Sequence, residues 1–328
     1  MGKNVVAGID IGGTNTRIGL ADDEGNVLLG TCIATDKHPV ADMYVEVIYN
    51  EIETLLKGGG SEPYGLIGIG IGAPNGNYHT GCIEDAVNLP WQQVPLTAAL
   101  NRYYPTLPVK LTNDANAVAL AEMVYGDAKG LKDFIVVTLG TGLGSGFVAN
   151  GDIVYGYDGL AGELGHIIAI ENGRECNCGR CGCLETYASA TGIKRTVFEL
   201  LCNSAEKNDK SVLRDIDFHN LSAKDIDKAA REGDSIANKA FEITGKILGK
   251  CLADMVAVTS SSHIFLFGGL AEARELIFTP TIESLKKNIL FCYKNKETGE
   301  PKVKILPSGL GNKDTGIIGA AALIWKDK

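Results

Sequence analysis

The chain has 328 residues, of which 45% are hydrophobic and 22% are charged, and its formal net charge is −9. This composition is typical of a folded globular protein, and the acidic excess disfavours a nucleic-acid partner, because phosphates require a basic surface. No apolar run reaches the roughly 18–20 residues that span a bilayer, and no signal-peptide core follows the first residues, so we expect a cytoplasmic protein without a membrane partner.

The first part of the chain alternates short apolar segments with glycine-rich turns. Turn residues around alternating apolar positions indicate strands, whereas apolar residues three and four apart indicate helices. We therefore predict strands over 5–9, 17–21, 27–29, 66–73 and 109–112, and helices over 42–57 and 115–125.

The second part of the chain repeats the opening order: a strand, a Gly/Thr loop, a strand, a tight turn and a strand. Here we predict strands over 134–139, 147–149, 153–154, 263–267 and 302–306, and helices over 235–257 and 316–325. Because one core rarely grows beyond about 250–300 residues, we expect an α/β protein of two domains with a boundary near residue 114.

The two Gly/Thr loops form the first candidate site. They are Asp10-Ile-Gly-Gly-Thr14 and Gly140-Thr-Gly-Leu-Gly-Ser-Gly146. Such loops offer backbone N–H groups and a hydroxyl to phosphate oxygens, so the pair predicts a nucleotide phosphate site. The Asp10 carboxylate then suits a magnesium ion held through water. The alternative is that both loops are tight hairpins without a ligand.

Asn113 and Asp114 lie between a predicted strand and a predicted helix. A carboxylate at this position is commonly a helix N-cap. The functional alternative is a general base, which accepts the proton of a hydroxyl that attacks a phosphate.

A dense cysteine cluster predicts a metal site. Cys176, Cys178, Cys181 and Cys183 fall within eight residues, and His166 lies ten positions before the first of them. In a chain without a secretion signal this spacing favours a tetrahedral Cys₃His zinc site over disulfides. Cys181 is a competing ligand, and an all-cysteine set is the alternative. We expect the scattered cysteines to be buried small hydrophobes; they are Cys32, Cys82, Cys202, Cys251 and Cys292.

Acidic and amide side chains near this cluster suggest a polyhydroxylated ligand. Glu163 and His166 share a face if they lie on one helical turn, and Glu185 follows the last cysteine by two positions. Carboxylates and amides suit sugar hydroxyls, because each hydroxyl both donates and accepts. A helix N-terminal charge is the alternative role for Glu185.

Together these segments resemble the ROK family of bacterial sugar kinases and repressors. The motifs that carry the resemblance are the two Gly/Thr loops, Asn113-Asp-Ala-Asn-Ala117, Gly162-Glu-Leu-Gly-His166, Cys176-Asn-Cys-Gly-Arg-Cys-Gly-Cys-Leu-Glu185 and Gly316-Ile-Ile-Gly-Ala-Ala321. The resemblance implies an actin-like ATPase fold, duplicated and RNase H-like, with ATP and sugar in the cleft between two α/β domains. The smaller domain would comprise 1–114 and 316–328, and the larger 115–315 with the zinc-binding loop.

The resemblance also implies a role for each matching residue. Asp114 resembles the catalytic base that deprotonates the 6-hydroxyl of the sugar. The implied sugar ligands are Asn88, Asn113, Asp114, Glu163, His166 and Glu185. The implied zinc ligands are His166, Cys176, Cys178 and Cys183, which leaves Cys181 spare. The implied contacts to ATP and magnesium are Asp10, Gly12, Gly13, Thr14, Gly140, Thr141, Gly142, Gly268 and Gly269.

The expected activity is therefore ATP-dependent phosphorylation of a hexose, with Mg²⁺, a structural Zn²⁺ and a homodimeric assembly. Glucose is our first choice of substrate, and fructose, mannose, allose, N-acetylglucosamine and N-acetylmannosamine are alternatives. A sugar sensor without catalysis and an ATPase that acts on protein partners are alternatives of other classes. Family repressors carry a DNA-binding segment before the first strand, which here begins at Val5, so we expect none.

Overall fold

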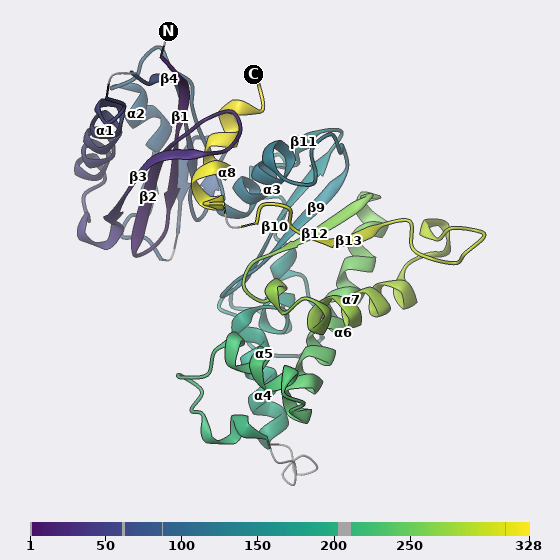
Figure 1. Ribbon diagram of the computed structural model, residues 1–328. Coiled ribbons are helices and arrows are strands. Elements are labelled where there is room, and N and C mark those ends of the chain that lie inside the picture. Colours follow the sequence, from purple (N-terminus) through teal and green to yellow (C-terminus); the bar gives the residue numbers. More distant parts are fainter. Residues whose placement is uncertain (1, 61–62, 87, 203–210, 312) are drawn as a thin grey trace. The chain divides into compact units, whose positions relative to one another are not determined.

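The computed structural model describes residues 2–60, 63–86, 88–202, 211–311 and 313–328 (Figure 1). Contacts between residues divide the chain into two compact units. Unit 1 comprises Met1–Lys132, Gly146–Gly162 and Ser308–Lys328, and unit 2 comprises Asp133–Ser145 and Glu163–Pro307. The domains expected from the sequence, 1–114 with 316–328 and 115–315, follow the two duplicated halves of the chain. These boundaries stay a prediction.

Unit 1 is built on a five-stranded mixed sheet in the order β3-β2-β1-β4-β8. The strands are β1 (Asn4–Ile11), β2 (Asn15–Ala21), β3 (Val27–Ala34), β4 (Gly65–Gly72) and β8 (Val109–Thr112). β1, β2 and β3 pair antiparallel, while β4 pairs parallel with β1 and with β8. The parallel strands require crossover connections, and these bring the ends of β1 and β8 to the same edge of the sheet.

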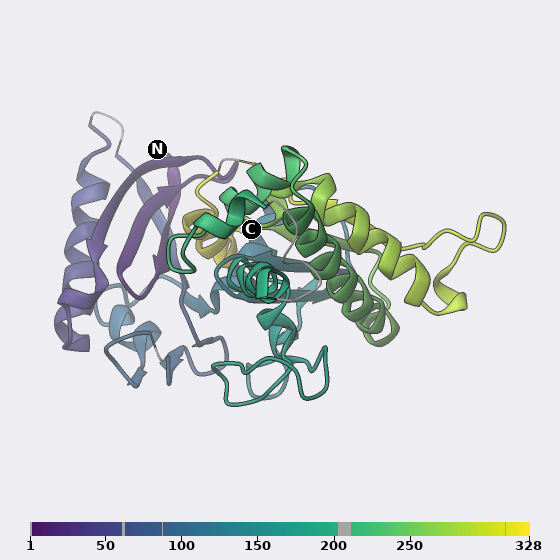
Figure 2. The same cartoon turned by 90° about the horizontal axis from the view of Figure 1, so that it is seen from below.

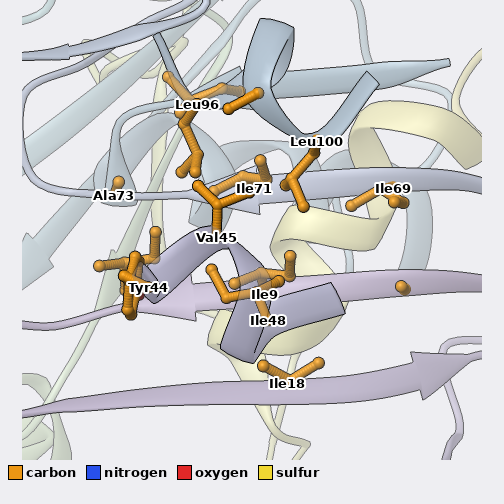
Figure 3. Packing of buried hydrophobic residues seen from close by; sticks show 14 of the residues in the cluster. Ile9, Ile18, Tyr44, Val45, Ile48, Ile69, Ile71, Ala73, Leu96 and Leu100 are labelled. Carbon is orange, nitrogen blue, oxygen red and sulfur yellow. The ribbon is translucent and has the colours of Figure 1, made fainter. Parts of the chain in front are cut away.

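One face of this sheet packs against α1 (Ala41–Lys57) and α2 (Leu96–Asn101). Figure 3 shows strand side chains such as Ile9 and Ile71 pointing towards Ile48 of α1 and Leu100 of α2. The apolar spacing that predicts the helix over 42–57 therefore reflects a buried face, and that prediction is confirmed. Burial of these aliphatic side chains stabilises the layer by roughly 1.5–3 kcal/mol for each one.

The other face of the sheet is covered by α8 (Thr315–Trp325), which also packs against α3 (Asp114–Tyr125) (Figure 1). The helix approaches the strands so closely that a Cβ atom added at Gly70 would lie 1.8 Å from the carbonyl oxygen of Ala320. The run of glycines in β4 thus permits direct contact between helix and sheet backbone. A small antiparallel sheet completes this part of the unit; its strands are β5 (Gly76–Asn77), β6 (Cys82–Glu84) and β7 (Gln93–Val94).

The second sheet has the order β11-β10-β9-β12-β13, which repeats the arrangement of the first. Its strands are β9 (Phe134–Leu139), β10 (Leu143–Ala149), β11 (Asp152–Ile153), β12 (His263–Phe267) and β13 (Lys304–Pro307). β12 pairs parallel with both β9 and β13. The expected duplication of an α/β unit is therefore confirmed, although β13 begins two residues after the predicted position 302.

The helices of unit 2 include the long α6 (Ser235–Thr259), which packs along α7 (Glu275–Asn288) (Figure 2). The other helices are α4 (Ala190–Cys202) and α5 (Ala223–Arg231), with 3-10 turns at Leu164–His166, Leu184–Thr186, Val212–Asp215, Ala271–Ala273 and Phe291–Tyr293. In unit 1 a further 3-10 turn spans Thr35–Lys37. None of the helices of the described residues is long and apolar enough to cross a membrane.

The prediction that the scattered cysteines are buried is wrong for most of them. Cys251 is buried in α6, but Cys82 is half-buried and Cys32, Cys202 and Cys292 are exposed. Cys32 lies on the edge strand β3, and Cys202 ends α4. A lone cysteine carries no periodic signal, so its hydrophobic character alone does not tell which face of an element it occupies.

Candidate functional site

In unit 1 the first Gly/Thr loop joins β1 to β2, and Asp10 precedes it. The Asp10 carboxylate accepts hydrogen bonds from Arg17 Nη2 at 2.6 Å and Nε at 3.2 Å. Arg17 Nη1 also lies 3.0 Å from Asp314. The Asp10 side chain is 24% exposed, so this ion pair orients it while leaving room for water. Such a placement suits a carboxylate that meets a hydrated magnesium ion.

The same loop approaches Asn88 closely. A Cβ atom added at Gly13 would lie 2.7 Å from the carbonyl oxygen of Asn88, and the Gly12 N–H donates to Asn15 O at 2.9 Å. Thr14 is exposed at the tip of this turn. The structure thus brings Asn88, a predicted sugar ligand, beside the predicted phosphate loop.

Asp114 is the first residue of α3, and it is not the N-cap. Asn113 takes that position: its side chain accepts a hydrogen bond from Asn116 N at 2.7 Å. Asp114 Oδ1 accepts from Ala115 N at 2.8 Å. Asp114 is exposed to solvent. The protein packed around it still partly desolvates the carboxyl and raises its pKa; the Ala115 N–H opposes this shift, and the charge of Asp10 adds to it. A solvent-accessible carboxylate with a raised pKa is suited to accepting a proton from a substrate hydroxyl.

In unit 2 the second Gly/Thr loop connects β9 to β10 and contacts Glu185. The Leu143 N–H donates to Glu185 Oε2 at 3.1 Å. A Cβ atom at Gly142 would lie 2.2 Å from the same oxygen, so a side chain there would displace the Glu185 carboxylate. Gly140 O accepts from Ala190 N at 2.8 Å, which ties the loop to the start of α4.

Gly268 and Gly269 follow β12 and lie beside the end of β9. Gly268 has a φ of +101°, a conformation that favours glycine. Leu270 N donates to Leu139 O at 3.1 Å, one residue before Gly140. The Gly268-Gly269 loop, an implied contact to ATP, and the predicted phosphate loop therefore leave neighbouring strands at the same edge.

In unit 2 a cavity of about 230 Å³ opens beside the second Gly/Thr loop. It is lined by Thr141, Gly142, Glu175, Cys176, Asn177, Glu185, Thr186, Ser189, Thr191, Gly192 and Arg195. Four of these residues were predicted to belong to the site. The residues from Ser189 to Arg195 were missed, and the signal that could have found them is the helix that begins five residues after Glu185.

The metal cluster assembles from the four predicted ligands. The side chains of His166, Cys176, Cys178 and Cys183 present atoms that all lie within 4.8 Å of one another. Cys176 Sγ lies 3.7 Å from His166 Nδ1, and Cys178 Sγ lies 3.5 Å from Cys183 Sγ. A tetrahedral zinc with ordinary bond lengths separates its ligand atoms by about 3.5–3.8 Å. The cluster therefore fits zinc. Within the described residues Cys181 is exposed and does not belong to the cluster.

Glu163 precedes the 3-10 turn that contains His166. Its Oε2 lies 4.0 Å from His166 Nε2, on the other side of the ring from the thiols. The expectation that these two residues share a face of one turn is confirmed. Glu185 Oε1 in turn lies 3.8 Å from Cys176 Sγ. His166 and Glu185 are both candidate sugar ligands, and they connect the metal cluster to the candidate sugar site.

The duplicated α/β fold, a Gly/Thr loop in each half and the Cys₃His cluster agree with one family model. The model described as "ROK family" matches residues 6–327, and the chain belongs to this family.

The chain is 36% identical to the glucokinase of Halalkalibacterium halodurans over 324 residues, which are 97% of this chain and 94% of that protein. A ROK family glucokinase from Streptomyces griseus, solved in complex with glucose and AMPPNP, superposes with a TM-score of 0.76 at 31% identity and covers 97% and 98% of the two chains. The xylose repressor of Bacillus subtilis is 27% identical, covering 93% of this chain and 73% of the repressor.

Proposed function

We propose that this protein is an ATP-dependent glucokinase, which transfers the γ-phosphoryl group of ATP to the 6-hydroxyl of glucose. The observation that carries the proposal is the placement of Asp114: a solvent-accessible carboxylate at the start of α3, fixed by the Ala115 N–H, with a pKa raised by desolvation and by the charge of Asp10. The similarity to glucokinases over nearly the whole chain supports glucose as the substrate.

In the proposed reaction Asp114 accepts the proton of the 6-hydroxyl as that oxygen attacks the phosphorus. Its Oδ1 is fixed by the Ala115 N–H, so the carboxylate has a defined direction. Asn113 uses its oxygen for the helix cap and keeps its amide N–H groups for a sugar oxygen. General base catalysis of this kind contributes roughly 10²–10⁴-fold to the rate.

The remaining sugar ligands proposed in unit 2 are Glu163, His166 and Glu185, with Asn88 in unit 1. Carboxylates accept hydrogen bonds from hydroxyls, and the His166 Nε2 position lies on the side of Glu163. A hydroxyl that is both donor and acceptor can be satisfied by such a set. We therefore propose that these residues orient the sugar.

The two Gly/Thr loops are the proposed phosphate contacts, and Asp10 is the proposed partner of the hydrated magnesium ion. Magnesium, when bound, neutralises charge on the phosphate oxygens. Gly268 and Gly269 are proposed on the adenosine side because they lie beside the end of β9. The zinc cluster is proposed as structural, since its four protein ligands complete a tetrahedral shell.

A coupled assay of ADP release tests the proposal. It compares glucose, fructose, mannose, allose, N-acetylglucosamine and N-acetylmannosamine at saturating ATP, with and without added Mg²⁺. Strong, Mg²⁺-dependent turnover on glucose supports the proposal. Greater turnover on another member of the panel would replace glucose, and the absence of sugar-stimulated turnover would refute the kinase.

A sugar sensor is the second candidate, and the similarity to a xylose repressor favours it. A sensor binds a sugar but has little turnover. Calorimetric titration with glucose and xylose in the absence of ATP, beside the kinase assay, separates the two functions.

We further propose a homodimer in the cytoplasm. The family resemblance supports the dimer, and sedimentation equilibrium would show a mass near twice the 34.7 kDa of the chain. A mass of one chain at micromolar concentration would refute it.

A further inference from the structure

Arg174 is a buried arginine that none of the proposed catalytic roles uses. Its side chain is 7% exposed, and every N–H group of its guanidinium region faces an acceptor or a ring. Nε and Nη2 bind the two oxygens of Glu199 at 2.7 and 2.5 Å. The guanidinium carbon lies 4.3 Å from the centre of the Tyr187 ring.

The other acceptors of Arg174 lie on the segment that carries Glu185. Nη1 donates to the carbonyl oxygen of Thr186 at 2.6 Å and to that of Gly192 at 3.0 Å. The backbone N–H of Arg174 donates to the Tyr187 hydroxyl at 2.9 Å. One side chain therefore joins the residue after Glu185 to the first turn of α4.

The link is reciprocated from α4. Arg195 Nη1 donates to the carbonyl oxygen of Glu175 at 2.9 Å, and Arg174 O accepts from Gly182 N at 2.7 Å. The Glu175 carbonyl is thus held against α4, and the Arg174 carbonyl is held by Gly182 of the cysteine loop. None of these bonds uses the side chain of a candidate metal ligand; these ligands are His166, Cys176, Cys178 and Cys183.

We propose that Arg174 is a positioning residue that holds Glu185 at the cavity independently of the metal. The inference rests on the proposed function, in which Glu185 binds the sugar. Glu185 itself is fixed by the Leu143 N–H on one side and by the chain geometry of its neighbour Thr186 on the other. Lysine cannot replace Arg174, because only the planar guanidinium reaches the paired oxygens of Glu199 and two carbonyl groups together.

The first test uses steady-state kinetics of Arg174→Lys and Arg174→Met in the full-length protein. Both variants are expected to raise the KM for glucose at least tenfold and to change the KM for ATP less than threefold, with zinc content unchanged. Arg231→Met removes another ion-paired arginine of unit 2, one that binds Asp227 and Glu275, and is expected to leave both KM values within twofold of the wild type.

The second test uses hydrogen exchange and needs no activity. After zinc is removed by a chelator, the segment 174–187 is expected to stay protected in the wild type and to exchange at least tenfold faster in Arg174→Lys. Glu199→Gln keeps the arginine and weakens one end of the link, so it is expected to give a smaller change of the same sign.

The outcomes separate the two hypotheses. A wild type that phosphorylates no sugar refutes the proposed function, and the exchange test still decides whether the link is metal-independent. An active wild type whose glucose KM is unchanged in Arg174→Lys refutes the positioning role. Equal rises of both KM values together with loss of zinc would also refute it, because Arg174 would then act only by maintaining the fold.

Discussion

The position of Asp114 raises the free energy of its ionised form, and the same position suits a catalytic base. The residue is exposed at the start of α3, but the protein around its carboxylate partly desolvates it, and the negative charge of Asp10 adds to the free energy of ionising it. A single backbone N–H, that of Ala115, offsets part of this cost. The same environment that destabilises the ion makes it a stronger base.

We therefore expect Asp114→Asn to lower kcat by about 10²–10⁴-fold, the usual contribution of a positioned base. Calorimetric titration with glucose should show binding within a few fold of the wild type, because asparagine keeps the size and one oxygen of aspartate. A variant that retains wild-type kcat would exclude Asp114 as the base. Asn116→Asp is unsuitable as a control because Asn116 is buried, so Asp42→Asn on α1 serves instead.

The pH dependence follows from the raised pKa. The folded carboxyl binds its proton more tightly than the unfolded chain, whose aspartate pKa is about 3.9. Asp114 therefore lowers stability as pH rises from the unfolded pKa to the folded one, and the cost is complete above the folded pKa. We expect activity to increase as pH rises, opposite to the effect on stability, because the base must be ionised to accept a proton.

We expect kcat to fall on acidification through a pKa above the ordinary aspartate value. Asp114→Asn should be at least as stable as the wild type at pH 7, and its advantage should vanish near pH 3. Urea unfolding at both pH values, beside a pH–rate profile, checks this. Lower stability of the variant at pH 7 would contradict the assigned direction of the pKa shift.

At the scale of elements, the side chains of His166 and of three cysteines converge although none of them lies in a long helix or strand. Cys178 belongs to this cluster, whereas Cys181 is exposed outside it. We expect about one zinc per chain in the wild type and in Cys181→Ser, and a loss of zinc in Cys178→Ser. Elemental analysis of protein purified without added metal measures this. Loss of zinc in Cys181→Ser would mean that the ligand set is different.

The contact between α8 and the first sheet gives a second prediction for elements. Gly70→Ala would place a Cβ atom 1.8 Å from Ala320 O, so backbone must move. We expect a loss of about 3 kcal/mol in the free energy of unfolding, at the upper end of overpacking effects. Gly30→Ala on β3 is the control, since its nearest contact would be 3.4 Å, and it should be neutral or slightly stabilising. Denaturant unfolding compares the two, and equal stability of the two variants would contradict the close packing.

The sequence predicts some elements to the residue and misses others for a physical reason. The strands over 109–112, 134–139 and 263–267 agree in full with β8, β9 and β12. They are apolar runs bounded by polar or glycine residues, so their ends are marked. Helix α7 was not predicted, because Pro280 interrupts its pattern, yet the helix persists where α6 packs against it.

The candidate site shows the same division. Motif spacing predicted a metal site at the cysteines and His166, because the ligands are close in the chain, but it left Cys181 open; the family resemblance implied the set of four that the structure brings together. It did not identify Arg174 on the loop or Arg195 on α4, because each binds a carbonyl group of the other segment and these contacts exist only when the loop folds against the helix. It also left open which residue caps α3, and the geometry assigns Asn113.

At the scale of the whole molecule, the proposed ligands are divided between the two units. Asp10, Asn88, Asn113 and Asp114 belong to unit 1, and the proposed metal ligands with Glu185 belong to unit 2. The polypeptide passes between the units at residues 132, 145, 162 and 307. The two units that carry the proposed ligands are therefore joined by four chain connections.

We expect glucose to stabilise the whole chain against unfolding. At a hundredfold excess over its dissociation constant, a ligand that binds only the folded state adds about 2.7 kcal/mol. The temperature of unfolding should rise with glucose concentration and should not rise with xylitol, a polyol without a pyranose ring. A rise that is equal for both polyols would indicate a solvent effect in place of binding.

The Glu185 carboxylate, which accepts the N–H of Leu143, has one more consequence. The carboxylate that the proposal assigns to sugar binding also orders the loop assigned to the phosphates, so the two substrates would be thermodynamically linked. Such linkage is reciprocal: whatever factor glucose contributes to nucleotide affinity, the nucleotide returns to glucose. An enzyme built in this way would favour the ternary complex over either binary one, and would spend little ATP on water when the sugar is scarce.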